Sequence, residues 1–262
     1  QSNNSYFNGF CIHSNDHVEL NSGNYFEAGT TVSMPDLDDL EIPASGFDKN
    51  EGLKEALVEG SWNIRVIQQI DRIIAGVKTS TSDYTPSYIS ETSAVITLKS
   101  NKIVSGDLTT GRIHTYTCSG KGNDKTLTID TDVSSVVIYT NCELMFGSNR
   151  KIEDAVLVST NTGSKAVQGA NGLVLGRADN CVAGGEVQIV TSGSFYTTSA
   201  MTIYGSQILA KGNITFSALG DGSKGAALTA GGFISGTSNM DMSRCGTKNT
   251  GNFQASYFTM VR

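Results

Sequence analysis

The sequence predicts a mostly β protein, built as a right-handed parallel β-helix (solenoid) with a short helical insertion. Three observations favour this class. The expected strands are very short and rich in β-branched and aromatic residues, and Asn and Gly recur at their ends. Hairpin dipeptides do not recur regularly, as an antiparallel meander would require, and Asn171-Gly172 and Asp221-Gly222 are isolated candidates. We therefore expect residues 1–262 to form one β-solenoid-like domain.

Each part of the chain outside residues 50–78 fits this class. Residues 6–33 contain the strand-like runs FCIHS, HVEL and TTVSM, separated by the turn sequences NSGN and EAGT. The acidic stretch MPDLDDLEIPASGF then predicts a solvent-edged loop or a short helical turn. From about residue 93 the strand signals return, and 17 of the 29 glycines fall in residues 163–251. Because glycine permits tight turns, this distribution favours many short strands over disorder.

Residues 50–78 are expected to be the helical insertion or cap. Leu53, Ala56 and Leu57 suit a first short helix, which ends where Gly60 and Ser61 break the pattern. A second helix is indicated by isoleucines at the spacing of an amphipathic helix, namely Ile64, Ile67, Ile70, Ile73 and Ile74. Such a stripe needs an apolar surface. It caps an end of the β core, covers one sheet face, or binds a partner.

Composition excludes several classes of partner. Charged residues make up 17% of the chain, the net charge is −6 and the sequence pI is about 5.1. This balance disfavours nucleic acid, which requires a basic surface, and also an anionic membrane surface. No apolar run approaches the ~20 residues of a membrane helix. The chain begins at Gln1 in a polar stretch, so we expect targeting information and any membrane anchor to lie upstream.

Five cysteines occur without the spacing of a zinc site: Cys11, Cys118, Cys142, Cys181 and Cys245. The last four stand beside turn-like residues, which favours disulfides that hold loops in an oxidising compartment. Buried free thiols are the alternative. An odd number leaves one cysteine over, and we expect Cys11 to be unpaired or to have its partner upstream.

Two clusters are weak candidates for metal binding. His13 and His17 flank Asp16 at a spacing that shares one face of a strand, but the only other histidine is His114, so surface imidazoles in a turn are the alternative. A Ca²⁺ site could be formed by the acidic run of Asp36, Asp38, Asp39 and Glu41. This run lacks the EF-hand spacing, and a solvated acidic loop is the alternative. We expect no cofactor, with Ca²⁺ as the exception that the sequence allows.

Catalytic patterns are missing from the sequence. It contains no GxSxG, HExxH, Walker A or GxGxxG motif. Acidic residues are sparse in the β-rich second half, where a glycosidase or lyase would need paired carboxylates. Arg177 with Asp179 is a candidate site pair, and a structural ion pair near Cys181 is the simpler interpretation. We expect a protein that is not an enzyme.

Two long stretches carry a resemblance to a known family. They are CIHSNDHVELNSGNYFEAGTTVSMPDLDDLEIPASGF, followed by GLKEALVEGSWNIRVIQQIDRII, and RADNCVAGGEVQIVTSGS…MTIYGSQILAKGNITFSA…GGFISGTSNMDMSRCGT. Over most of residues 10–247 the chain resembles the C-terminal region of TadE/TadG-like Flp-pilus-assembly proteins. The resemblance implies a missing N-terminal membrane helix and a periplasmic or surface-exposed region. On that basis we expect the disulfides Cys118–Cys142 and Cys181–Cys245.

These observations together predict a structural or adhesion module of the bacterial cell envelope, associated with tight-adherence pili. We expect protein partners in the envelope or pilus, or self-association, because the terminus of a β-helix is an unpaired sheet edge. The alternative is a β-helix protein that binds or cleaves polysaccharide. A binding module would use exposed tyrosines and Trp62, although Trp62 also suits packing at the start of the isoleucine-rich helix.

Overall fold

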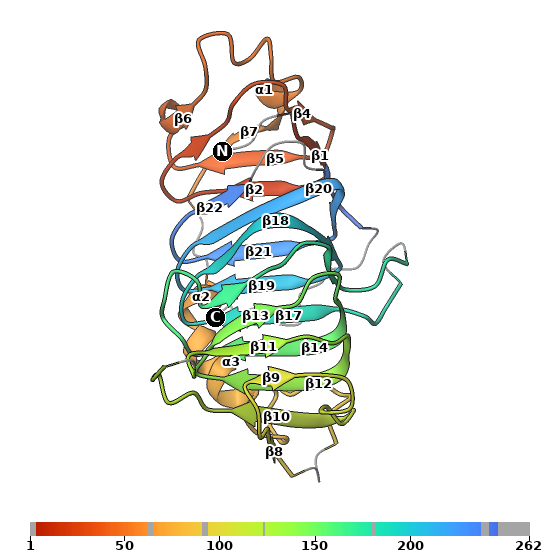
Figure 1. Cartoon of the computed structure of the whole chain (residues 1–262). Coiled ribbons are helices and arrows are strands. Elements are labelled where there is room, and N and C mark those ends of the chain that lie inside the picture. The colour runs from red at the N-terminus through yellow and green to blue at the C-terminus, as the bar shows by residue number, and fades with distance from the viewer. Residues whose placement is uncertain are drawn as a thin grey trace, which may run out of the picture.

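The computed structural model describes residues 4–61, 65–90, 94–122, 124–179, 182–236 and 241–245. These residues form a parallel β-solenoid of about 11 turns, which confirms the predicted fold class (Figure 1). Successive coils stack in register. Gln207 pairs with Ala227 and Ile214 with Ile234, an offset of 20 positions in both cases. The short strands of the sequence are therefore the rungs of a stack rather than the arms of hairpins.

Each coil passes through three strand positions, and each position stacks on the same position of the next coil. The first stack contains β8 (Ile96–Thr97), β10 (Arg112–Tyr116), the ends of β12 (Val133–Thr140) and β14 (Lys151–Ser159), β17 (Val187–Thr191), β19 (Gln207–Ala210) and β21 (Ala227–Ala230). The second contains β9 (Lys102–Ile103), β11 (Thr126–Ile129), β13 (Glu143–Phe146), β15 (Val167–Gln168), the starts of β18 (Phe195–Tyr204) and β20 (Ile214–Lys224), and β22 (Ile234–Gly236).

The third stack joins the two ends of the described chain. It contains the starts of β12 and β14, β16 (Leu173–Leu175), the ends of β18 and β20, β23 (Asp241–Ser243), β1 (Tyr6–Asn8) and β4 (Tyr25–Phe26). The remaining strands continue the first stack as β2 (Cys11–His13), β5 (Thr31–Met34) and β7 (Leu57–Glu59), and the second as β3 (Val18–Glu19) and β6 (Leu40–Glu41).

The coils are stacked out of sequence order. Strand β1 pairs with β23 on one side and with β4 on the other, so the N-terminal coils sit on the C-terminal ones (Figure 1). The chain rises from β1 to β7, passes along the outside of the stack, and starts again at the opposite end with β8. We call the β1–β23 contact the seam. It pairs Phe7 with Met242, two residues from opposite ends of the sequence.

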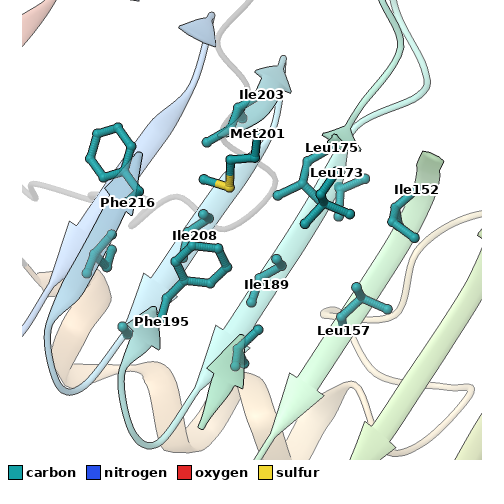
Figure 2. Close-up of a cluster of buried hydrophobic side chains, with 14 of the residues drawn as sticks. Ile152, Leu157, Leu173, Leu175, Ile189, Phe195, Met201, Ile203, Ile208 and Phe216 are labelled. Atoms are coloured by element: carbon teal, nitrogen blue, oxygen red, sulfur yellow. The ribbon is translucent and has the colours of Figure 1, made fainter. Parts of the chain in front are cut away.

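The interior is filled by columns of apolar side chains. One column in the second stack runs through the register pairs of Leu127, Leu144, Val167, Phe195 and Ile214, all of which are fully buried. Figure 2 shows side chains such as Leu157, Ile189 and Ile208 projecting from neighbouring strands into this interior. Each fully buried side chain of this kind contributes about 1.5–3 kcal/mol through the hydrophobic effect. The solenoid is therefore stabilised by contacts between coils.

In eight coils a left-handed residue forms the corner just before the first-stack strand. Positive φ values recur at this corner, at Gly9, Gly29, Gly111, Ser135, Asp154, Gly185, Gly205 and Gly225. Six of these eight residues are glycine, the residue that adopts this conformation without steric cost. Ser135 and Asp154 adopt it without being glycine, and each lies inside a continuous strand.

The predicted helical insertion is divided between two places. The helix α1 (Leu53–Ala56) buries Leu53 and Ala56 and contacts β4 and β5 at the upper end of the stack (Figure 1). The 3₁₀ turn η1 (Leu37–Asp39) contacts β5 and β7. The helices α2 (Arg65–Gln68) and α3 (Ile70–Gly76) lie along the outer face of the first stack. The break between α1 and these two helices was predicted, but the strand β7 that forms it was not, and Leu57, expected in the first helix, belongs to β7.

The isoleucine stripe covers a sheet face rather than capping an end. Ile70, Ile73 and Ile74 are buried in a second apolar cluster, separate from the interior, to which the first stack contributes Val137, Val156, Val158, Val190 and Leu209. Ile67 packs partly buried against the same cluster. The capping interpretation is therefore wrong for these isoleucines, and their buried side chains are not free for a partner. Ile64 and Trp62 lie outside the described residues.

Candidate functional site

The predicted histidine site is divided between two local networks. His13 lies on β2, where its Nδ1 is 2.9 Å from the Ser33 hydroxyl and its Nε2 is 2.8 Å from the Asn15 side-chain oxygen. His17 instead meets Asp16, with 2.9 Å between Nδ1 and the carboxylate. The hydrogen bond that His17 donates to the Asp16 carboxylate raises the pKa of His17. The two imidazoles thus serve separate contacts, as expected for side chains of a surface turn.

The acidic run caps a turn instead of converging on one point. The Asp36 carboxylate accepts a 2.9 Å hydrogen bond from the Asp38 amide and so forms the N-cap of η1. Asp38 and Asp39 are exposed. Over the described ranges, no three His, Cys, Asp or Glu side chains gather where they could hold a metal ion. This arrangement favours the solvated loop over the Ca²⁺ site.

A group of ionisable side chains lies around residues 177–179 and 182–186. The Arg177 guanidinium pairs with Asp179 and donates to the carbonyls of Ala183 and Gly184, at 3.1 and 3.3 Å. The hydrogen bond with Asp179 raises the pKa of Arg177, and the same bond lowers the pKa of Asp179. These contacts close the loop on itself, so Arg177 has the structural role that was the simpler interpretation.

Two carboxylates hold the other side of this loop. Asp154 accepts a 2.7 Å hydrogen bond from the Gly185 amide, and Glu186 accepts one of 3.2 Å from the Gly184 amide. Tyr88 lies near both, and burial, followed by the charges of Asp154 and Glu186, raises its pKa strongly. The group brings together two carboxylates and a phenol, but each carboxylate already accepts a hydrogen bond from a backbone amide. Sequence reasoning missed Tyr88, because no motif near it indicates this neighbourhood.

An aromatic ladder marks the N-terminal coils. Tyr6 and Tyr25 stack with ring centroids 5.5 Å apart. On the interior side of the same two strands, Phe7 and Phe26 stack with centroids 5.1 Å apart. Tyr25 is 37% exposed. The Tyr6 hydroxyl donates to Glu27 over 2.8 Å, and this hydrogen bond raises its pKa. The ladder follows from the register, because β1 and β4 place Tyr on Tyr and Phe on Phe.

One histidine lies inside the solenoid. His114 is fully buried on β10, and its Nε2 accepts a 3.0 Å hydrogen bond from the Thr109 amide. Burial lowers its pKa, so the imidazole stays neutral. It pairs in register with Ile96 and Ile138, both in the same stack. In the sequence His114 stands out only as the third histidine, and its burial was not predicted.

The predicted disulfides are supported as far as the described residues reach. Cys118 and Cys142 form a disulfide across neighbouring coils, which confirms that pair. Cys245 is also disulfide-bonded. Cys181 lies outside the described residues, so the pair Cys181–Cys245 stays a prediction. Cys11 is a free, exposed cysteine.

With this geometry in hand, the chain can be compared with known proteins. The family model for a domain of unknown function, DUF7867, matches residues 1–246. The chain belongs to the DUF7867 family. No curated protein and no solved structure matches it. The DUF7867 match includes both strands of the seam, so the out-of-order stack lies within the family domain.

DUF7867 membership leaves the resemblance to TadE/TadG proteins untested, and that resemblance stays a prediction. In this DUF7867 chain, the helices of the described residues are all too short and too polar to cross a membrane.

Proposed function

We propose that this DUF7867 chain is a non-enzymatic structural scaffold of an extracytoplasmic surface. The proposal rests on one observation: several charged side chains form ion pairs within the solenoid. Asp130 forms ion pairs with Lys102 and Arg150, which belong to two other coils, at 2.8 and 2.9 Å. These ion pairs link neighbouring coils. Arg177 and Asp179 close a loop in the same manner. These side chains are engaged in supporting the stack, as expected of a scaffold.

The redox chemistry supports a place outside the cytoplasm. The Cys118–Cys142 disulfide requires an oxidising environment to persist, as found in the periplasm or at the cell surface. In the chain-entropy model a loop of this length contributes about 3–4 kcal/mol. We propose a periplasmic or surface-exposed location on this basis. Association with tight-adherence pili is the finer proposal, and the sequence resemblance to TadE/TadG proteins supports it.

A first experiment separates scaffold from enzyme. The purified chain would be incubated with a panel of acidic and neutral polysaccharides, and products would be followed as new reducing ends and as unsaturated uronates. Negative-stain images and sedimentation would record assembly in parallel. Regular oligomers without product support the scaffold. Product formation that the variant Glu186→Gln abolishes would overturn it, and Glu153→Gln on the same strand as Asp154 serves as the control.

Glycan binding is a second candidate, supported by the exposed face of Tyr25 in the aromatic ladder. Sugar rings pack on tyrosine through their apolar faces, and Glu27 and Asn8 stand beside the ladder as hydrogen-bonding groups. A glycan array tests this proposal with Tyr25→Ala as the variant and Tyr204→Ala as the control. Loss of a bound glycan in the first variant alone supports the ladder as its site. No glycan binding, or equal binding by both variants, removes it.

A further inference from the structure

The lowest coil of the solenoid has no strand in its third position. Its first two positions are occupied by β8 and β9, and residues 104–111 then lead to β10 without forming a strand (Figure 1). The start of β12 pairs with β14 on one side, and no described strand pairs with it on the other side. We call residues 104–111 the lower loop. The whole of this loop and of β12 is described, so the open strand edge belongs to this part of the fold itself.

A cavity of about 190 Å³ lies between the lower loop and the start of β12. Its described lining comes from two segments alone, residues 104–110 and 131–136. Pockets for drug-sized molecules measure roughly 300–1,000 Å³. This cavity therefore suits a smaller ligand, of the size of one sugar ring.

Hydroxyl groups line the cavity on both sides. Ser105 and Thr110 belong to the lower loop, and Thr131 and Ser134 belong to the facing wall. In the described part of the chain, the hydroxyls of Ser105, Thr110 and Thr131 form no hydrogen bond with another protein group. Because a hydroxyl both donates and accepts, this lining matches a ligand that carries several hydroxyls of its own.

A carboxylate and an apolar surface complete the lining. One oxygen of Asp132 accepts the Lys151 amide at 2.9 Å, and the other oxygen has no protein partner among the described residues. A free carboxylate oxygen accepts strong hydrogen bonds from ligand hydroxyls, and its charge repels an anionic ligand. Val133 and Val136, both buried, offer an apolar surface to the C–H groups of a ring. Together these groups fit a neutral sugar ring.

The walls of the cavity are fixed by hydrogen bonds of the lower loop. The Val104 amide donates to the Asp107 carboxylate at 2.8 Å, and the Thr109 amide donates to Nε2 of the buried His114 at 3.0 Å. At the end of the loop, the Gly111 amide donates to the carbonyl of the residue at the β12 corner, at 2.7 Å. A ligand would therefore enter a preformed site, which lowers the entropic cost of binding. The buried imidazole acquires a role as the acceptor that holds one wall.

We propose that this cavity binds a single neutral sugar residue. The free hydroxyls and the Asp132 carboxylate bind the hydroxyls of the sugar, and the valines pack against its ring. The site lies in the lowest coil, whereas the Tyr6–Tyr25 ladder lies in the N-terminal coils near the upper end (Figure 1). The proposal does not depend on the scaffold role or on glycan binding at the ladder.

Protein-observed NMR of the full chain tests the site directly. The probes are methyl glycosides of neutral hexoses and N-acetylhexosamines, with the methyl glycoside of glucuronic acid as the anionic comparison. At least one neutral probe should shift the amide signals of residues 104–110 and 131–136 with a Kd on the order of 1 mM, and the glucuronide should bind more weakly. The proposal is overturned by no shift with any neutral probe, by a glucuronide that binds as well as the neutral probes, or by shifts centred on Tyr25 instead.

Isosteric variants separate the hydroxyls from the shape of the cavity. Thr110→Val with Thr131→Val removes two lining hydroxyls and should weaken binding of the neutral probe by about tenfold. Thr109→Val is the matched control in the lower loop, because Thr109 lies outside the lining and its amide still donates to His114. The control should leave the Kd unchanged. Equal affinity in the double variant and the control, with both folded by circular dichroism, would contradict the proposal.

A third variant tests the preference for a neutral ligand. Asp132→Asn keeps an oxygen that can accept the Lys151 amide but removes the charge. It should weaken binding of the neutral probe and narrow the difference between that probe and the glucuronide. An unchanged difference between the two probes would show that Asp132 does not face the bound sugar.

Discussion

The side-chain amide of Asn24 donates to the side-chain oxygen of Asn50, 2.8 Å away, and both residues are buried. Asn50 donates in turn to the carbonyls of Asn21 and Gly46, at 2.9 and 2.8 Å. The pair therefore satisfies backbone groups of a turn that would otherwise be buried without partners. Such networks are worth more as a set than singly, because losing one member leaves several groups unsatisfied.

We predict that Asn50→Ala lowers the free energy of unfolding by about 2–3 kcal/mol, because it removes the acceptor of the Asn24 backbone and side-chain amides and a donor to the Gly46 carbonyl. Urea denaturation followed by circular dichroism measures this loss. Asn15→Ala, at an exposed turn, is the control and should change stability by less than about 0.5 kcal/mol. A loss at Asn50 no larger than at Asn15 would contradict the importance of the network.

Two glycines with nearly equal φ values separate backbone strain from crowding. Gly29 (φ 88°) has open space where a Cβ would lie, whereas a Cβ on Gly176 (φ 85°) would lie 1.8 Å from the Tyr204 carbonyl oxygen. We predict that Gly29→Ala costs about 1 kcal/mol from the left-handed conformation alone. Gly176→Ala should cost several times more or prevent folding. Melting temperatures of the two variants, measured side by side, test the difference, and equal losses would refute it.

Removing the disulfide should weaken the stack without changing its fold. We predict that Cys118→Ser with Cys142→Ser lowers the free energy of unfolding by about 3–4 kcal/mol, through the freedom gained by the unfolded chain. Guanidinium denaturation under non-reducing conditions measures the change. Cys11→Ser is the control, since Cys11 is free and exposed. A double variant as stable as the control would show that the bond contributes little.

Two histidines should give the stability opposite pH dependences. Burial lowers the pKa of His114. Between that lowered pKa and about pH 6.5, the imidazole is therefore protonated in the unfolded chain but not in the folded chain. Stability therefore falls as the pH drops below about 6.5 towards that lowered pKa, by at most about 1.4 kcal/mol per pH unit. His17 has a raised pKa, so its contribution is complete below about 6.5 and is lost as the pH rises through the folded value.

The variant His114→Gln keeps an acceptor for the Thr109 amide but does not titrate. We predict that it flattens the stability curve between about pH 6.5 and 5, while His17→Asn lowers stability most below about pH 6.5 and removes the decline that His17 causes above it. Thermal melts across a pH series measure both. An unchanged acid slope in His114→Gln would assign that slope to other groups.

The helix on the outer face should depend on packing more than on charge. Ile73 is buried against the first stack, whereas Asp71 pairs with Lys211 at the exposed surface. We predict that Ile73→Ala costs about 2–4 kcal/mol and Asp71→Asn less than about 1 kcal/mol. Denaturant titration compares the two. A larger loss from Asp71→Asn would reverse the assignment.

Local features of the fold were predictable from the sequence, and long-range ones were not. Strand length and turn composition predicted the parallel stack, and the isoleucine spacing predicted α3, because both are local patterns. That spacing did not predict which surface Ile70 and Ile73 pack against, because any apolar surface could bury them. The seam has no local signal either, because nothing near Phe7 identifies Met242 as its neighbour.

The candidate site shows the same division. The loops around the Cys118–Cys142 bond were predictable from turn residues, whereas the pairing itself came from a family resemblance. The corner at Ser135 and Asp154 was missed because neither residue is glycine, and only the stacking shows that both contact glycine corners of other coils, Gly111 and Gly185. Burial of His114 and the position of Tyr88 depend on the coil to which each residue belongs, which no short sequence window specifies.

The seam also bears on synthesis of the chain. During translation β1 is made long before β23, the strand on which it rests. Until then the lower face of the N-terminal coils, with Phe7 at its centre, stays uncovered. Ordinary solenoids can add each new coil to the one just made. This chain must instead hold the coils of β1 to β7 open until β23 has been made, so a stalled or truncated product would expose that apolar edge to other nascent chains.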